Sequence, residues 1–182
     1  HSRSSDWYLR YQKGLDTFLA DGRESLDLLV AECPVTLPLI DFGGGVTSKN
    51  LLGLDELIIW AYYFANVGRY QKVADLGANI GAHTLVLAKL GFSVTAFEPD
   101  PSHSVIAQEV FQQNDITAKV DWRTEAVVPD AIVNPSVDFV RVLGNTTSSH
   151  VAGSKLKPYG PLETLRVPTA SFEPILSQHQ LL

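Results

Sequence analysis

One segment, residues 73–98, constrains the fold of this 182-residue chain more than any other. Residues 73–84 (VADLGANIGAHT) begin as a buried strand, and their glycines allow a sharp turn with close backbone approach. Residues 84–90 have the character of a helix that Gly91 ends, and residues 93–97 are rich in β-branched and aromatic side chains. The segment therefore predicts a strand, a tight turn, a helix and a second strand, which delivers Glu98 at its carboxyl end.

The two acids of this segment point to a ribose-bearing ligand. Glu98 follows Asp75 by 23 positions. At an offset of roughly 20 residues, an acid at the end of the second strand accepts hydrogen bonds from ribose hydroxyls. We therefore expect the glycine turn and Glu98 to form one nucleotide-type site.

Two details favour S-adenosylmethionine over a dinucleotide at this site. The dinucleotide fingerprint needs a glycine two positions after the first, where this chain has Asn79, and Gly77 and Gly81 are four positions apart. Asp75 places a carboxylate at the strand end, where it can meet a ligand ammonium, which suits an amino-acid tail better than a pyrophosphate. An NAD-dependent oxidoreductase is therefore the less favoured alternative.

The runs 75–81 (DLGANIG) and 96–101 (AFEPDP) resemble the FkbM-type family of S-adenosylmethionine-dependent methyltransferases. Weaker likenesses at Asn114, residues 125–127 and residues 148–150 extend the resemblance over roughly residues 54–176. It implies a Rossmann-like α/β methyltransferase fold and, as the reaction, O-methylation of a small-molecule or sugar hydroxyl. By the same resemblance, the methionine moiety would lie at Asp75, Gly77, Asn79 and Gly81. The ribose would lie at Glu98, and the adenine at Glu125 and Ala126.

The chain departs from that family after residue 176. Family members usually continue into a strand of the form D-x-E-G and three further strands, which this sequence lacks before Leu182. We therefore expect a fold truncated after the third core strand and a hairpin insertion, with the C-terminal half absent. A non-catalytic S-adenosylmethionine-binding or structural module is then the main alternative to an enzyme. The open edge of the first core strand, residues 72–76, would favour homo-oligomers unless residues 35–42 or 137–142 cover it.

Three parts are expected along the chain. Residues 1–5 resemble the end of an affinity tag, residues 6–53 form an N-terminal helical and extended segment, and residues 54–182 form the methyltransferase domain. Within 6–31, apolar residues at three- and four-residue steps predict two helices that break at Asp21-Gly22. The remaining predictions are an extended segment at 35–42, helices at 55–66 and 102–113, a third strand at 118–123, and a strand at 137–142 paired antiparallel with 165–168.

Composition narrows the class of partner. The net charge of −6 and pI near 5.3 argue against nucleic acid, and a small-molecule or glycan acceptor suits the chain better. The longest apolar run, residues 57–65, is too short to span a bilayer, so no membrane association is expected. A single cysteine, Cys33, suits a reducing compartment, and the cytoplasm is the expected location.

Catalytic residues are less legible than the cofactor site. The histidines lack the spacing of a metal site, so no metal is expected. His150, on a loop predicted to lie over the cofactor, is the best-placed acceptor-side base, because an imidazole there could take a hydroxyl proton. His83, on the cofactor helix, is expected to pack or line the site. The glycines at 43–45 lack the G-K-[ST] order of a phosphate loop and are interpreted as a connector.

Overall fold

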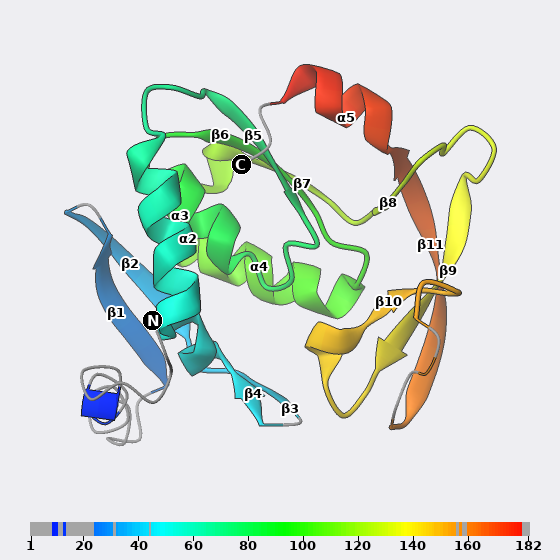
Figure 1. Cartoon of the computed structure of the whole chain (residues 1–182), viewed down its shortest axis with the longest axis horizontal. Coiled ribbons are helices and arrows are strands. Elements are labelled where there is room, and N and C mark those ends of the chain that lie inside the picture. The colour runs from blue at the N-terminus through cyan, green and yellow to red at the C-terminus, as the bar shows by residue number, and fades with distance from the viewer. Residues whose placement is uncertain are drawn as a thin grey trace.

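A parallel three-stranded sheet forms the centre of the protein (Figure 1). The computed structural model describes residues 9–10, 13, 24–30, 32–43, 45–155, 157 and 160–179. The sheet has the order β5 (Lys72–Leu76), β6 (Ser93–Phe97), β7 (Val120–Arg123). Helices α3 (Ala82–Lys89) and α4 (Pro101–Gln113) make the two connections. The predicted Rossmann-like α/β fold is confirmed in this region, and the strands end along one edge of the sheet, where Leu76 pairs with Phe97 and Phe97 with Arg123.

Local signals explain the ends of these elements. Gly81 stands before α3 in the left-handed conformation, with φ 79°. Asp100 caps α4 by accepting a hydrogen bond from the Ser102 N–H, and Pro101 occupies the first helical turn, where its missing N–H costs nothing. The third strand starts two residues later than predicted, because a 3₁₀ turn, Thr117–Lys119, occupies the beginning of that segment.

The main core lies between this sheet and the elements that cover one of its faces. Helix α3 is buried almost all round, which its apolar sequence allows, and packs on β6 and against α4 and the strand β2 (Cys33–Pro38). Helix α2 (Leu54–Ala65), confirmed where residues 55–66 were predicted, contributes Trp60. Asn114, the C-cap of α4, exchanges hydrogen bonds with the backbone N–H and C=O of Thr36, both at 2.8 Å, and so fixes β2 against the helix.

The prediction of a helix reaching residue 31 was wrong at its end. Residues 25–30 form the strand β1 (Ser25–Val30), which pairs antiparallel with β2. Leu26 is fully buried, Asp27 is exposed and Leu29 is 78% exposed, so burial alternates as it does in a strand. Residues 9–10 and 13 are helical, whereas the break predicted at Asp21-Gly22 lies outside the described residues. The extended segment at 35–42 became β2 and the short β3 (Asp41–Gly43), which pairs with β4 (Val46–Thr47) ahead of a 3₁₀ turn, Ser48–Leu52.

A second sheet stands beside the first, at the right of Figure 1. Its order is β10 (His150–Val151), β9 (Ser136–Val142), β11 (Leu162–Ser171), β8 (Ala126–Val128), and a 3₁₀ turn, Thr146–Ser148, precedes β10. The predicted antiparallel pairing is confirmed, although β11 is ten residues long and its last three residues pair in parallel with β8. Helix α5 (Phe172–Gln178) follows, and His179 after it contacts Thr95 of β6, with 2.9 Å between Nε2 and Oγ1.

The outer strand β5 of the central sheet has one side without a described neighbouring strand. Within the part of the chain that the structure describes, β5 pairs only with β6. Neither of the segments expected to cover this edge does so, because residues 35–42 pair with β1 and β4, and residues 137–142 pair with β10 and β11. Leu76, at the end of β5, is 40% exposed.

Candidate functional site

Asp75 lies near the end of β5 and faces helix α3. The buried Thr84 of α3 donates a hydrogen bond of 2.6 Å from Oγ1 to Asp75 Oδ2. Burial raises the pKa of Asp75, and the charge of Glu98 adds to the rise, while the Thr84 hydrogen bonds and His83 oppose it. A carboxylate in such a place gains from a cationic partner, which would relieve the cost of its burial.

The glycine turn after β5 carries three left-handed residues, Gly77, Asn79 and Gly81, with φ of 78°, 53° and 79°. The two end glycines have different reasons to lack a side chain. A Cβ at Gly81 would lie 2.6 Å from the Phe111 ring, so this glycine lets α3 and α4 approach each other. A Cβ at Gly77 would meet nothing within 4 Å, so Gly77 leaves its side of the turn open.

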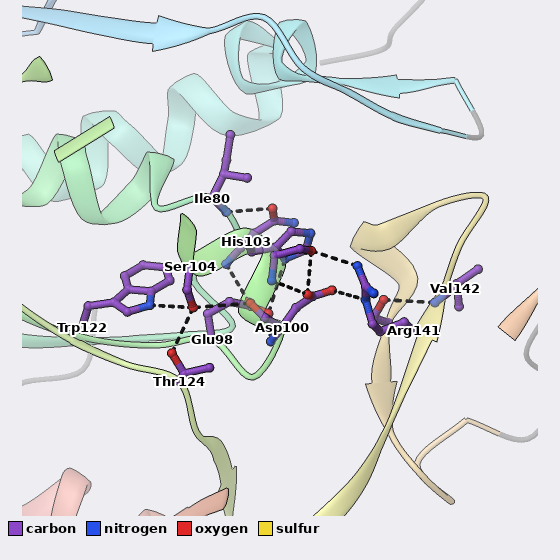
Figure 2. A network of polar contacts seen from close by, with 12 residues as sticks. Ile80, Glu98, Asp100, His103, Ser104, Trp122, Thr124, Arg141 and Val142 are labelled. Carbon is purple, nitrogen blue, oxygen red and sulfur yellow. Dashed lines mark hydrogen bonds and ion pairs between the residues drawn. The ribbon is translucent and has the colours of Figure 1, made fainter. Parts of the chain in front are cut away.

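Glu98 joins the turn to the second strand. It is 5% exposed, and its Oε2 accepts a hydrogen bond of 2.8 Å from the Asn79 N–H. Its Oε1 accepts one of 2.9 Å from the Asp100 N–H and lies 3.4 Å from His103 Nδ1 (Figure 2). Each carboxylate oxygen has two acceptor positions, so both oxygens retain capacity for a further donor.

Asp100 extends this cluster to the second sheet. It is fully buried, caps α4, and accepts a hydrogen bond of 2.8 Å from Nε of Arg141 in β9 (Figure 2). Burial raises its pKa, but hydrogen bonds from Ser102, the charge of His103 and the hydrogen bond from Arg141 together hold the pKa below its usual value. Arg141 also contacts Glu163 of β11 at 2.6 Å. Arg141 thereby connects the paired strands β9 and β11 to the loop that carries Glu98 and Asp100.

Two cavities meet at Gly77, which lines both. One, of about 460 Å³, is mostly apolar and lies toward the second sheet, with lining residues Leu76, Gly77, Phe97, Pro99, Glu125, Ala126, Val127, Val128, Pro129, Phe139, His150, Val151 and Phe172. The other, of about 290 Å³, is more polar and lies toward α2 and α3, with lining residues Phe42, Val46, Thr47, Asn50, Leu51, Glu56, Asp75, Gly77, Ala78, Asn79, Ile80, Ala82, His83 and Thr147. We call them the apolar and the polar cavity.

The polar cavity contains a chain of contacts that sequence reasoning did not find. His83 Nδ1 lies 3.1 Å from the Tyr63 hydroxyl, and His83 Nε2 lies 3.1 Å from Glu56 Oε2. Burial raises the pKa of Tyr63 to about 12, with the charges of Asp75 and Glu56 adding to the rise. His83 therefore lines the cavity, as expected, but between a carboxylate and a hydroxyl rather than as simple packing.

The structure brings most of the sequence-predicted residues together. Asp75, Gly77 and Asn79 line the polar cavity, and Glu125 and Ala126 line the apolar one. Glu98 and Gly81 line neither cavity; Glu98 lies behind the Asn79 N–H, and Gly81 packs against Phe111. His150 is in the apolar cavity, with Nδ1 3.1 Å from the Ser148 carbonyl oxygen.

Arg141, Asp100 and His103 were not singled out in the sequence. Only the Asp-Pro-Ser order at 100–102, a helix-start signal, could have indicated the cap. Among the described residues no group of three or more His, Cys, Asp or Glu is placed to hold a metal ion, and none of the helices is long and apolar enough to cross a membrane.

No protein-family model matches the chain, and no protein of curated function does. Among solved structures, the chain is similar to an S-adenosylmethionine-dependent methyltransferase from Agrobacterium tumefaciens, with 18% identity over 57% of this chain and 33% of that one and a TM-score of 0.43. A candidate methyltransferase of the same kind from Streptococcus mutans has 18% identity over 62% of this chain and 28% of that one, with a TM-score of 0.42. The chain thus spans about a third of the length of these two proteins, and likeness at this level assigns no family.

Proposed function

We propose that this chain binds S-adenosylmethionine and that the protein transfers its methyl group to a hydroxyl of a small molecule or sugar. The observation that carries the proposal is the hydrogen bond between Glu98 Oε2 and the Asn79 N–H. It joins the two parts of the sequence that predict a nucleoside site, at the edge where the parallel strands end. Ligands of open α/β sheets bind at this edge.

The residues present fit such a ligand. Asp75 supplies a carboxylate in the polar cavity, where an ammonium of the amino-acid tail would relieve its burial. Gly77 lines both cavities, and the space that a Cβ would occupy there is empty, so a ligand could extend past Gly77 from one cavity into the other. The apolar cavity, with Phe97 and Ala126 in its wall, suits a flat purine.

Methyl transfer from a sulfonium needs little covalent help. The bound cofactor supplies an activated methyl group. The protein has to hold an acceptor oxygen in line with the bond from sulfur to that methyl group, and to exclude competing water. In this proposal Asp75, the glycine turn and Glu98 hold the cofactor in place. His150 is given no part in proton transfer, because it lies in the cavity proposed for the purine.

Calorimetric titration with three ligands tests the proposal. S-adenosylhomocysteine should bind more tightly than 5′-methylthioadenosine, which lacks the amino-acid tail, and NAD should bind most weakly. Binding of NAD without S-adenosylhomocysteine would overturn it. If S-adenosylhomocysteine binds, incubation with S-adenosylmethionine and a panel of hydroxyl acceptors, followed by mass spectrometry, separates a methyltransferase from a binding module.

A further inference from the structure

A third cavity lies beside the buried imidazole of His103. His103 is 4% exposed, and neither of its ring nitrogens has a hydrogen-bond partner among the described residues. Glu98 Oε1 lies 3.4 Å from its Nδ1. His103 lines a cavity of about 400 Å³, within the usual size range of small-molecule sites. Figure 2 shows His103 close to Glu98 and Asp100, in the first turn of α4.

The walls of this cavity come from three separate parts of the chain. Ile40 and Phe42 lie on one side, Ile106 of α4 on another, and Leu143 and Thr146 on the loop after β9. The lining is mixed, because the apolar side chains of these walls stand beside Asp41, Ser102, His103 and Thr146.

Backbone packing holds the first and third walls together. A Cβ at Gly43 would lie 2.2 Å from the Gly144 carbonyl oxygen, so β3 and the loop after β9 are in direct backbone contact. The cavity is therefore a built feature of the fold and not a gap between loose segments.

Two other polar side chains in the cavity, those of Asp41 and Ser102, already have partners. The Asp41 carboxylate accepts a hydrogen bond of 2.8 Å from the Gly43 N–H, and the Ser102 hydroxyl donates one of 2.7 Å to Asp100. Among the side chains that line the cavity, His103 is the buried one whose polar atoms lack a hydrogen-bond partner in the described part of the chain, and a buried polar group without such a partner is costly.

The position of Glu98 indicates what His103 can bind. A carboxylate beside Nδ1 favours the tautomer with its proton on that nitrogen, which leaves Nε2 as an acceptor. The matching ligand group is a hydroxyl that donates to Nε2. An aromatic ring behind that hydroxyl could pack against the four apolar side chains of the lining, Ile40, Phe42, Ile106 and Leu143. We propose that this cavity is a second ligand site, which takes a phenol-class molecule with its hydroxyl on His103.

The place of this site gives it a function. Phe42 lines both this cavity and the polar cavity, and Thr146 and Thr147 line one each. If the protein is a methyltransferase, a hydroxyl ligand bound here would be the methyl acceptor. Its oxygen would take the methyl group as the bond from that group to sulfur breaks, S-adenosylhomocysteine would leave, and the hydroxyl proton would pass to Nε2 of His103, whose imidazolium Glu98 would stabilise. That acceptor role rests on the proposed function, whereas binding itself does not.

Nuclear magnetic resonance of ¹⁵N-histidine-labelled full chain tests binding without any cofactor. The probes are phenol and anisole, which has the same ring but no hydroxyl proton. Phenol should shift the His103 ring resonances in a saturable manner, and anisole should bind about fivefold more weakly, the effect of one hydrogen bond. Unmoved His103 resonances, or equal affinities for phenol and anisole, would overturn the proposal and leave the histidine satisfied by water alone.

Two variants locate the ligand, and neither changes His103. Thr146→Trp should fill the cavity and abolish the phenol shift, whereas the matched control Thr147→Trp, one residue away and facing the polar cavity, should retain it. The opposite pattern would place phenol outside this cavity. A chain that binds S-adenosylhomocysteine but leaves His103 indifferent to phenol would refute only this second site, and a phenol site without S-adenosylhomocysteine binding would refute only the proposed cofactor.

Discussion

Replacing Glu98 by alanine should destabilise the protein as well as weaken the proposed cofactor binding. The Glu98 carboxylate is the acceptor for the N–H groups of Asn79 and Asp100, at 2.8 and 2.9 Å. Leaving a buried donor unsatisfied costs about 1–3 kcal/mol, so two such donors amount to about 2–6 kcal/mol. That is a large part of the roughly 5–15 kcal/mol by which a domain is stable.

Urea unfolding followed by circular dichroism measures this loss. With a slope of about 2 kcal/mol per molar urea, the midpoint should fall by roughly 1–3 M. Glu98→Gln should lose less, because its amide oxygen still serves one of the two donors. Glu109→Ala, at an exposed position of α4, is the matched control and should leave the midpoint nearly unchanged.

Calorimetry on the folded variants then separates the two roles of Glu98. If the carboxylate also accepts ribose hydroxyls, Glu98→Ala should bind S-adenosylhomocysteine about 10- to 150-fold more weakly, which corresponds to the about 1.5–3 kcal/mol of hydrogen bonds to a charged group. A variant with lowered stability but unchanged affinity would show that Glu98 only supports the turn. Unchanged stability and unchanged affinity together would refute the whole reasoning.

Three further predictions concern the residues around this site. The pKa of Asp100 is lower in the folded protein than in the unfolded chain, where it is about 4. Its ionised carboxylate therefore stabilises the folded state above about pH 4, and this stabilisation is lost as the pH falls through the folded-state pKa. Asp100→Asn should accordingly reduce the loss of stability measured between pH 5 and 2. Gly81→Ala should lower the unfolding midpoint much more than Gly77→Ala, since both glycines have positive φ but only the Gly81 Cβ would strike the Phe111 ring, and equal losses in chemical unfolding would contradict this. Ultraviolet titration should find one tyrosine, absent in Tyr63→Phe, that ionises near pH 12, and a titration in which that variant matches the wild type would disprove the buried environment of Tyr63.

The parallel unit could be predicted from the sequence because its signals are local and agree with one another. Residues 93–97 form β6 with the predicted bounds, and α4 differs from the prediction by one residue at its start. β-branched residues, the glycine turn and a proline at a helix start each act within a few positions of the chain. The meeting of Glu98 with the turn followed from the rule that parallel strands end at one edge.

The errors come from residues whose conformation is decided by partners outside the segment itself. Residues 25–30 have leucines at spacings compatible with a helix, but they pair with β2, which in turn is fixed to α4 by Asn114. The length of β11 likewise depends on two different neighbours, β9 for its first part and β8 for its end. Neither pairing leaves a signal within the segment itself.

The contact between Arg141 and Asp100 changes how the site is understood. The sequence predicts Glu98 as an acid that binds a ligand. In the structure its carboxylate already accepts hydrogen bonds from the glycine turn and from Asp100, the N-cap of α4. Asp100 in turn accepts a hydrogen bond from Arg141 of the second sheet. A ligand hydroxyl would therefore add to these contacts and not replace them. A site that is ordered before binding spends less free energy on ordering. The second sheet would therefore contribute, through Arg141, to the affinity for the proposed cofactor, even though Arg141 lines neither of the cavities at Gly77.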